Sequence, residues 1–197
     1  MENQDFTRIA AHMLIVVGPS GTGKSTLLFH LLSQRASCVF SRSTTTRAPR
    51  GREKNGVEYD FVDVDTFKAK IDAGEFAEYA SVFGNYYGTP HRMIRNNVEA
   101  GLDVVFDIDV QGARQLKTTY PGAWCLLIAP PSMEILEQRL RARATDAPDV
   151  IERRLNTARS ELAQTDLFDF TIINDDLHTA QNLIVTLYDA MTLRAQR

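Results

Sequence analysis

The sequence predicts an α/β protein built on a parallel sheet that helices cover on both faces. Two observations predict this fold class. Short, nearly continuous apolar segments recur along the chain, and segments with helical spacing separate them. The apolar segments are residues 12–17 (HMLIVV), 38–41 (CVFS), 103–108 (DVVFDI), 124–129 (WCLLIA) and 170–174 (FTIIN). Strands that alternate with helices in this way indicate one five-stranded parallel sheet flanked by helices.

Helices are predicted between these strands. TLLFHLLSQ follows a glycine-rich turn, and a helix over residues 90–100 is expected to start with Thr89 as its N-cap and Pro90 at its first position, and to end at Gly101. Helical spacing also predicts four further helices, in QGARQLKTTY after residue 110, in SMEILEQRLRAR from 132, in VIERRLNTARSELAQ from 150 and at the C-terminus from about 177.

Residues 42–90 interrupt this alternation. STTTRAPRGREKNGVEYDFV is polar and turn-rich, DTFKAKIDAGEF predicts a short helix ended by Gly74, and FAEYASVFGNYYG alternates as strands do. We therefore expect a small α+β lobe, inserted after the second core strand. Residues 1–11 are expected to be an N-terminal tail, and residues 12–197 one globular unit.

Composition excludes several classes of function. With 197 residues the chain is long enough for one core and a small lobe. A net charge of −3 argues against a nucleic-acid partner. No apolar run approaches the roughly 20 residues that cross a bilayer, and the acidic start with Glu2 and Asp5 does not resemble a secretory signal. We expect a cytoplasmic protein without a membrane partner, in which Cys38 and Cys125 are reduced core residues.

A phosphate-binding loop follows the first strand. The stretch GPSGTGKS fits the pattern G-x-x-x-x-G-K-[ST] and opens a helix, which is the context that this motif requires. Lys24 is expected to reach the β- and γ-phosphates of ATP, and the Ser25 hydroxyl to bind Mg²⁺. The residues assigned to ATP here are Gly18, Pro19, Ser20, Gly21, Thr22, Gly23, Lys24, Ser25 and Thr26. The fold expected is thus similar to that of P-loop NTPases.

A second anion site is predicted in the inserted lobe. Arg47 and Arg50 lie three residues apart in STTTRAPR. Guanidinium groups bind phosphate oxygens in pairs, so two of them suit a phosphate monoester. From this stretch alone, a solvated basic turn is an equal alternative.

Seven motifs together resemble the guanylate kinases: GPSGTGKST, STTTRAPR, NGVEYDFV, FAEYASVFGNYYGT, FDIDVQG, IAPPS and IINDD. They match in order and spacing from about residue 12 to about residue 195. The resemblance implies ATP-dependent phosphorylation of GMP to GDP, with Mg²⁺. It also implies a core (residues 12–41, 91–138 and 165–197), a GMP-binding lobe (42–90) and a lid (139–164).

The resemblance assigns the acceptor site residue by residue. Arg47, Arg50, Tyr59 and Tyr87 would hold the GMP phosphate, and Ser43, Glu78 and Thr89 would read the guanine. Guanine presents N1–H and an exocyclic amine side by side, so one carboxylate accepts both protons, whereas adenine lacks that amine. Glu78 is therefore expected to set the preference for GMP over AMP.

Two acids follow the strand at 103–108. Asp107 lies at its carboxyl end, where α/β sheets present ligand-binding groups, and is expected to act on Mg²⁺ directly or through water. The resemblance places Asp107 and Asp109 near GMP. For Asp109, a cap on the following helix is the alternative.

The resemblance also places three lid arginines. Arg143 and Arg154 would close over the phosphates, Arg139 would contact ATP, and Asn174 matches a position near the adenine. Lys24, Arg50, Arg143 and Arg154 would supply the positive charge for phosphoryl transfer. Ala144 and Pro148 depart from the pattern of relatives and are expected to stiffen the lid hinge without removing a charge.

Two other functions remain alternatives. A relative could phosphorylate another small phosphate ester, such as ribose 1,5-bisphosphate, but Ser43, Glu78 and Thr89 are all present. A non-catalytic scaffold that binds phosphopeptides would not need the intact phosphate loop. The sequence leaves open whether dGMP is accepted and whether the protein is a monomer or a homo-oligomer.

Overall fold

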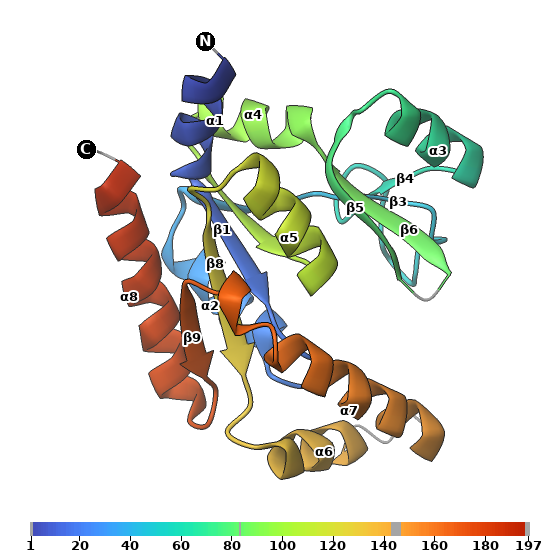
Figure 1. Cartoon of the computed structure of the whole chain (residues 1–197), viewed down its shortest axis with the longest axis vertical. Helices are drawn as coiled ribbons and strands as arrows, with labels where there is room; N and C mark the ends of the chain where they lie inside the picture. Colours follow the sequence, from blue (N-terminus) through green and yellow to red (C-terminus); the bar gives the residue numbers. More distant parts are fainter. Residues whose placement is uncertain (1, 83, 143–146, 196–197) are drawn as a thin grey trace.

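The computed structural model of the protein describes residues 2–82, 84–142 and 147–195. Its centre is a five-stranded sheet in the order β2-β7-β1-β8-β9, and every neighbouring pair is parallel (Figure 1). The strands are β1 (Met13–Val17), β2 (Cys38–Phe40), β7 (Asp103–Asp107), β8 (Trp124–Ala129) and β9 (Phe170–Ile173). All five predicted strands and the parallel sheet are confirmed.

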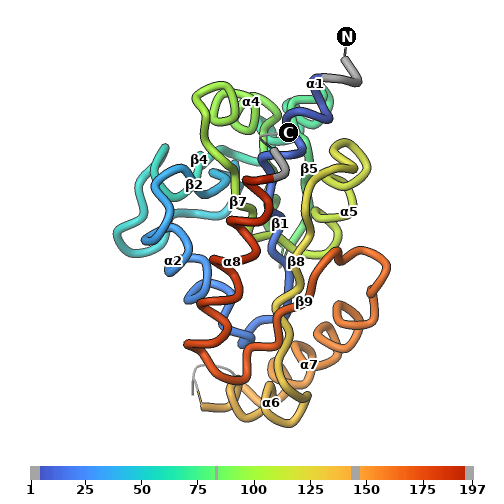
Figure 2. Tube along the Cα trace, turned by 90° about the vertical axis from the view of Figure 1, so that its left-hand side faces the viewer, coloured from blue at the N-terminus to red at the C-terminus, as the bar shows by residue number. Residues whose placement is uncertain are grey.

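Helices cover the two faces of this sheet. Alternate residues of β1 point to opposite faces, so Met13, Ile15 and Val17 join one apolar cluster and Leu14 and Val16 the other. The first cluster also includes α4 (His91–Glu99) and α5 (Val110–Thr119), and the second includes α2 (Lys24–Gln34) and α8 (Leu177–Ala195). Figure 2 shows α2 and α8 side by side on that second face.

The N-terminal segment, expected to be a tail, forms helix α1 (Glu2–Ala10). Ile9 and Ala10 are buried against the sheet, and the ring of Phe6 lies edge-on to that of Tyr120 at 5.3 Å. The residues that contact the core, Phe6, Ile9 and Ala10, have the i, i+3, i+4 spacing of a helix, but they cover little more than one turn, which is too short to have predicted a helix.

A second, four-stranded sheet lies between residues 44 and 90, in the order β4-β3-β6-β5. Its strands are β3 (Thr44–Thr45), β4 (Asp60–Phe61), β5 (Phe76–Val82) and β6 (Asn85–Pro90). Helix α3 (Val64–Asp72) starts at Asp63, whose side chain accepts a hydrogen bond from the Thr66 amide, and ends two residues before Gly74, as predicted. Phe67 of α3 stacks on Phe76 and Tyr86, with ring centroids 4.5 and 5.4 Å apart. The lobe thus has an aromatic core of its own.

The predicted start of α4 is wrong by one residue. Pro90 is the N-cap, α4 begins at His91, and Thr89 is still in β6. The Thr89 hydroxyl donates instead to the Glu78 carboxylate, 2.6 Å away. Threonine is a common cap, but here a tertiary acceptor takes its hydroxyl.

Helices α6 (Met133–Ala142) and α7 (Pro148–Leu162) form a pair beside the core (Figure 1). Leu136, Leu140, Ile151, Leu155 and Ala158 form a small apolar cluster between them. Pro148 is the first residue of α7, as expected of a proline that lacks an N–H. The predicted lid boundary at residue 139 falls within α6, and Ala144 lies outside the described residues.

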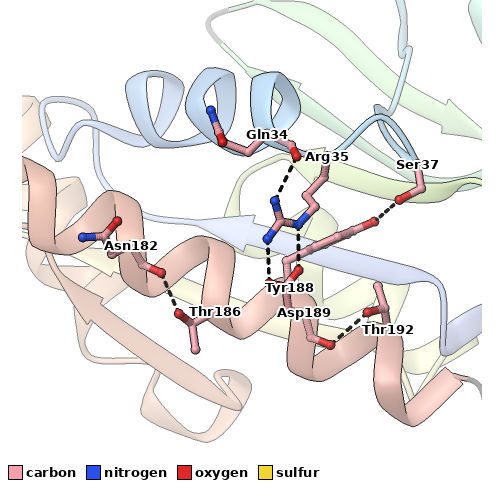
Figure 3. A network of polar contacts seen from close by, with 8 residues as sticks. All are labelled: Gln34, Arg35, Ser37, Asn182, Thr186, Tyr188, Asp189 and Thr192. Atoms are coloured by element: carbon pink, nitrogen blue, oxygen red, sulfur yellow. Dashed lines mark hydrogen bonds and ion pairs between the residues drawn. The ribbon is translucent and has the colours of Figure 1, made fainter.

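A polar network joins the amino ends of the strands to α8. The buried Asp103 carboxylate accepts from the Tyr188 hydroxyl at 2.5 Å and lies 2.7 Å from His12 Nδ1. Figure 3 shows the nearby part of this network, in which the Tyr188 hydroxyl contacts Ser37 and the Arg35 guanidinium donates two hydrogen bonds of 2.7 Å to Asp189. The network ties the end of α2 and the start of β7 to the C-terminal helix.

Within the described ranges, no helix combines the length and the apolar character needed to cross a membrane.

Candidate active site

The candidate site is a cavity of about 480 Å³ at the carboxyl ends of β1 and β7. Ligands bind at this edge in open α/β sheets. Most of the residues predicted to bind the two nucleotides meet here. The cavity is lined by Gly18, Ser20, Gly23, Lys24, Ser25, Thr26, Ser43, Tyr59, Glu78, Tyr87, Asp107 and Asp109, together with Ala80, Val82, Ile108 and Glu161.

The phosphate loop turns between β1 and α2 on its glycines. A Cβ at Gly18 would lie 2.3 Å from the Ile128 carbonyl oxygen, so only glycine lets the loop pass this close to β8. Gly23 caps α2 with φ +91°, a left-handed conformation that side chains disfavour. The loop therefore delivers its amides and the N-terminus of α2 to one place, which is a site for anions.

Lys24 and Asp107 lie together at the floor of the cavity. The Lys24 ammonium donates to the Gly18 carbonyl and lies 3.8 Å from Asp107 Oδ1. Burial raises the pKa of Asp107, and the nearby Lys24 charge partly opposes this rise.

The same residues fit a magnesium ion in part. Ser25 is exposed to the cavity in the first turn of α2, and Asp107 supplies a carboxylate. The described part of the chain holds no group of three or more acidic, His or Cys side chains with metal-site spacing. Mg²⁺ commonly takes only one or two carboxylates and completes its shell with waters and substrate phosphates. Two protein oxygens are therefore sufficient for an ion that arrives with a nucleotide.

Asn174 holds the phosphate loop from the far end of the chain. The buried side-chain amide of Asn174 donates to the Thr22 carbonyl at 2.8 Å, and the backbone carbonyl of Asn174 accepts from Arg139 Nη2 at 2.9 Å. The Thr22 hydroxyl closes the turn by donating to the Pro19 carbonyl at 2.9 Å. Asn174 thus supports the backbone of the loop directly, and Arg139 contacts Asn174.

The three residues predicted to read guanine form one hydrogen-bonded group. Glu78 is 4% exposed, and its Oε1 accepts from the Thr89 hydroxyl at 2.6 Å. The Ser43 and Ser41 hydroxyls lie 3.4 and 3.3 Å from Thr89 Oγ1. Because the Thr89 hydroxyl donates its only proton to Glu78, both serines are placed to donate hydrogen bonds to Thr89.

Burial dominates the electrostatics of Glu78. It raises the pKa of Glu78 to about 7, although the hydrogen bonds from Thr89 lower it, and the nearby Asp109 charge raises it further. A carboxyl group with a pKa near neutrality in a cavity is typical of functional sites.

Three of the four predicted phosphate ligands, Arg47, Tyr59 and Tyr87, lie together in the lobe. Arg47 is 8% exposed and lies over the Tyr59 ring at 5.3 Å, and the rings of Tyr59 and Tyr87 are 6.1 Å apart. Arg47 Nη2 donates to Glu53 Oε1 at 3.0 Å, while Glu53 Oε2 accepts from the Arg50 amide at 2.7 Å. The Arg50 side chain is exposed and does not line the cavity.

Asp109 and Arg154 have contacts that the sequence left open. Asp109 is the N-cap of α5 and accepts from the Gly112 amide at 2.8 Å, and it also lines the cavity. The helix cap is therefore confirmed, and the contact of Asp109 with GMP stays a prediction. Arg154 of α7 donates from Nη1 to the Ser20 hydroxyl at 3.0 Å, and this bond joins α7 to the phosphate loop. Arg143 lies outside the described residues.

Sequence reasoning missed Ser41, Glu53 and Glu161. Glu161 of α7 lines the cavity, and burial raises its pKa, with the Lys24 charge opposing the rise. Ser41 is the last residue of the expected strand at 38–41, so its position at a carboxyl end was a usable signal. No pattern in the sequence marks Glu53 or Glu161.

One cavity that joins a phosphate loop to a buried carboxylate, with a buried arginine beside it, defines a P-loop phosphotransferase with a donor site and an acceptor site. The sequence matches the guanylate kinase family over residues 10–190, and the chain belongs to this family.

Relatives agree over nearly full length. The chain is 43% identical over 186 residues to a guanylate kinase from Myxococcus xanthus, covering 94% of this chain and 89% of the relative. It is 49% identical over 181 residues to one from Oleidesulfovibrio alaskensis, covering 92% and 88%. The crystal structure of guanylate kinase from Anaplasma phagocytophilum superposes with a TM-score of 0.69 at 34% identity, covering 90% of this chain and 84% of that one.

Proposed function

We propose that this protein transfers the γ-phosphoryl group of ATP to GMP and produces ADP and GDP. One observation carries the proposal: the buried Glu78 carboxylate opens into the same cavity as Lys24 of the phosphate loop. A purine base that pairs with Glu78 would direct its phosphate along the lobe, and the donor phosphates would occupy the loop. The family relationship supports the same reaction.

On the donor side, the phosphate loop would hold ATP. The loop amides and the start of α2 would bind the phosphates, and Lys24 would neutralise charge on the γ-phosphoryl group. Mg²⁺, bound with ATP near Ser25 and Asp107, would supply charge neutralisation at the β- and γ-oxygens. Asn174 and Arg139 would hold the loop in shape beside the nucleotide.

On the acceptor side, Arg47, Tyr59 and Tyr87 would bind the GMP phosphate, with Arg50 joining when the lobe closes. Arg47 is now paired with Glu53. An incoming phosphate would therefore share or replace that partner, and the planar guanidinium can contact both. This arrangement keeps Arg47 oriented before the substrate arrives.

Glu78 would read the base. As a carboxylate it accepts from guanine N1–H and from the exocyclic amine, and Ser43 and Thr89 would complete the contacts. AMP would leave the buried carboxylate without its partners, and such a mismatch can cost about 10⁴- to 10⁵-fold in specificity. Asp109 would flank this pocket from the start of α5.

The transfer step needs positioning and charge more than covalent chemistry. A GMP phosphate oxygen would attack the γ-phosphorus in line while the bond to the β-phosphate oxygen breaks. Arg154 already reaches the phosphate loop through Ser20, so the α6–α7 pair would act as a lid that excludes water. Arg143 would add a second lid charge.

The test is a coupled assay of ADP production from Mg-ATP with GMP, dGMP, AMP, CMP, UMP or no acceptor. We expect turnover with GMP and strong rejection of AMP. Lys24→Ala should lose turnover but still bind GMP in calorimetry, whereas Lys68→Ala, exposed on α3, should behave as wild type. Turnover of a sugar phosphate but not GMP, or failure to bind Mg-ATP, would overturn the proposal.

A further inference from the structure

The first turn of α5 lies directly against the Glu78 carboxylate. A Cβ added at Gly112 would lie 2.7 Å from Glu78 Oε2 and 3.4 Å from Asp109 Oδ1. Contacts under 3.0 Å force a neighbouring atom to move, and Glu78 Oε2 is the atom in the way. Gly112 is buried in the helix, and the Glu78 carboxylate occupies the space that a side chain at position 112 would need.

One turn further along α5, Gln115 holds the strand that carries Glu78. Its Nε2 donates to the Tyr79 carbonyl at 2.8 Å, and its Oε1 accepts from the Tyr79 amide at 3.0 Å. The side-chain amide thus pairs with both backbone groups of the residue after Glu78, as a neighbouring strand would. Gly112 and Gln115 are three residues apart and lie on the same side of the helix.

The opposite side of the carboxylate is also fixed. Glu78 Oε1 accepts from Thr89, so one oxygen is held by the lobe and the other meets α5. The register of β5 against β6 shifts between Phe76 and Glu78, so Glu78 is the first residue of regular pairing after this irregularity. Contact with the core helix α5 adds a second constraint on the Glu78 carboxylate.

We propose that Gly112 and Gln115 are specificity-determining positioning residues, because α5 sets how far the Glu78 carboxylate extends into the acceptor pocket. The inference rests on the proposed function and names residues beyond those that touch the base. A side chain at position 112 displaces the end of a flexible glutamate rather than backbone, so the fold survives while base recognition is lost.

The first test compares wild type, Gly112→Ala and Thr118→Ala. Thr118 is exposed on α5, and within the described ranges its hydroxyl bonds only to its own helix, at the Arg114 carbonyl, so it is the matched control. The readouts are kcat and KM for GMP, for IMP and for Mg-ATP. IMP keeps N1–H but lacks the exocyclic amine, so the GMP-to-IMP ratio of kcat/KM reports the geometry of the carboxylate.

We expect Gly112→Ala to lower kcat/KM for GMP at least about tenfold and to lower the GMP-to-IMP ratio, because discrimination depends on paired hydrogen bonds. The KM for Mg-ATP and the Tm should match those of Thr118→Ala. Gln115→Ala should act in the same direction without adding any atom, and serves as the second variant if Gly112→Ala does not fold.

A rescue separates displacement of Glu78 from a general effect. Glu78→Asp shortens the side chain by one methylene and should make room for the added methyl group. The double variant Gly112→Ala/Glu78→Asp should therefore be less impaired than the two single effects predict when added. Additive losses would contradict the inference.

The outcomes separate this inference from the proposed function. Wild-type protein that does not phosphorylate GMP overturns the function and the inference together. Wild type that phosphorylates GMP, with Gly112→Ala and Gln115→Ala that keep its GMP-to-IMP ratio, overturns the inference alone.

Discussion

Glu78 faces two opposing demands at the scale of a single residue. Burial favours its neutral acid and brings its pKa to about 7. Recognition of guanine, however, requires the carboxylate, because a protonated acid has one accepting position fewer. Under the proposed function, part of the free energy of GMP binding is therefore used to ionise Glu78.

The first prediction is that GMP affinity rises with pH through about 7, the pKa of Glu78, and levels off above it. The GMP phosphate itself titrates near about pH 6. Glu78→Gln should keep only that lower transition. Calorimetric titration with GMP on both sides of pH 7 measures this, and identical pH profiles in wild type and Glu78→Gln would contradict it.

The second prediction concerns stability without ligand. The pKa of Glu78 is higher in the folded chain than its usual value of 4.5, so the folded state binds this proton more tightly. The contribution is present below pH 4.5 and is lost as pH rises to about 7. Denaturant titrations across this window should show that the free energy of unfolding falls less with pH in Glu78→Gln than in wild type.

The candidate site could be predicted where a motif carries it. Gly18 to Ser25 were assigned from the pattern and its flanks, and Glu78 from the family resemblance. Glu53 and Gly112 could not be assigned, because their roles depend on neighbours that only the folded chain brings close. Glu53 contacts a residue six positions away, but Gly112 meets Glu78 across the boundary between core and lobe.

At the scale of elements, α6 and α7 depend on each other. Among the described residues, their shared cluster has five buried members, which is small beside the clusters on the two sheet faces. Elements with few buried contacts open at low free energy. The pair is thus suited to move while the core stays folded.

The third prediction tests this with Leu155→Ala. Truncating a buried leucine costs about 2 to 5 kcal/mol where neighbours cannot relax. Here Leu155→Ala should destabilise only the helix pair α6–α7. Amide hydrogen exchange should therefore speed up in Met133–Ala142 and Pro148–Leu162 but not in Phe76–Val82. Thr157→Ala, exposed on α7 and bonded only to the Arg153 carbonyl, is the control. Uniform acceleration across the chain would argue against a separate unit.

Most elements could be predicted from hydrophobic period. The central strands β1, β7 and β8 are buried along almost their whole length, so their apolar runs were unambiguous, whereas the edge strand β9 is mostly exposed and was predicted from its apolar residues alone. Boundaries failed where tertiary contacts override local preference: Thr89 was expected to cap a helix, and its hydroxyl instead bonds Glu78. Helix α1 was missed because its stability comes from packing of Phe6, Ile9 and Ala10 onto the core rather than from its own sequence.

At the scale of the whole molecule, the two ends of the sheet have different tasks. The carboxyl ends of the strands carry the candidate site, and the amino ends carry the network around Asp103, of which Figure 3 shows the nearby contacts of Arg35, Ser37, Tyr188 and Asp189. Asp103 and Asp107 open and close the same strand, roughly 13 Å apart at the rise of a β-strand. Stability and chemistry can therefore be changed separately.

The fourth prediction is that Tyr188→Phe destabilises the fold without affecting catalysis. It removes the hydroxyl that donates to the buried Asp103 carboxylate, and a buried acceptor left without its donor costs about 1 to 3 kcal/mol. The urea midpoint should fall while kcat and KM for GMP stay unchanged. Thr186→Ala, exposed on the same helix, should leave the midpoint as in wild type. A fall in kcat would link the two ends of the sheet.

The bond from Asn174 to the Thr22 carbonyl joins residues 152 positions apart. During synthesis on the ribosome, the side chain that holds the phosphate loop is added 152 residues after Thr22, at a pace of about 5 to 20 residues per second. A nascent chain would thus carry the loop for several seconds before its support arrives. Fragments released before Asn174 should lack a formed ATP site, so incomplete products would not withdraw nucleotide from the cell.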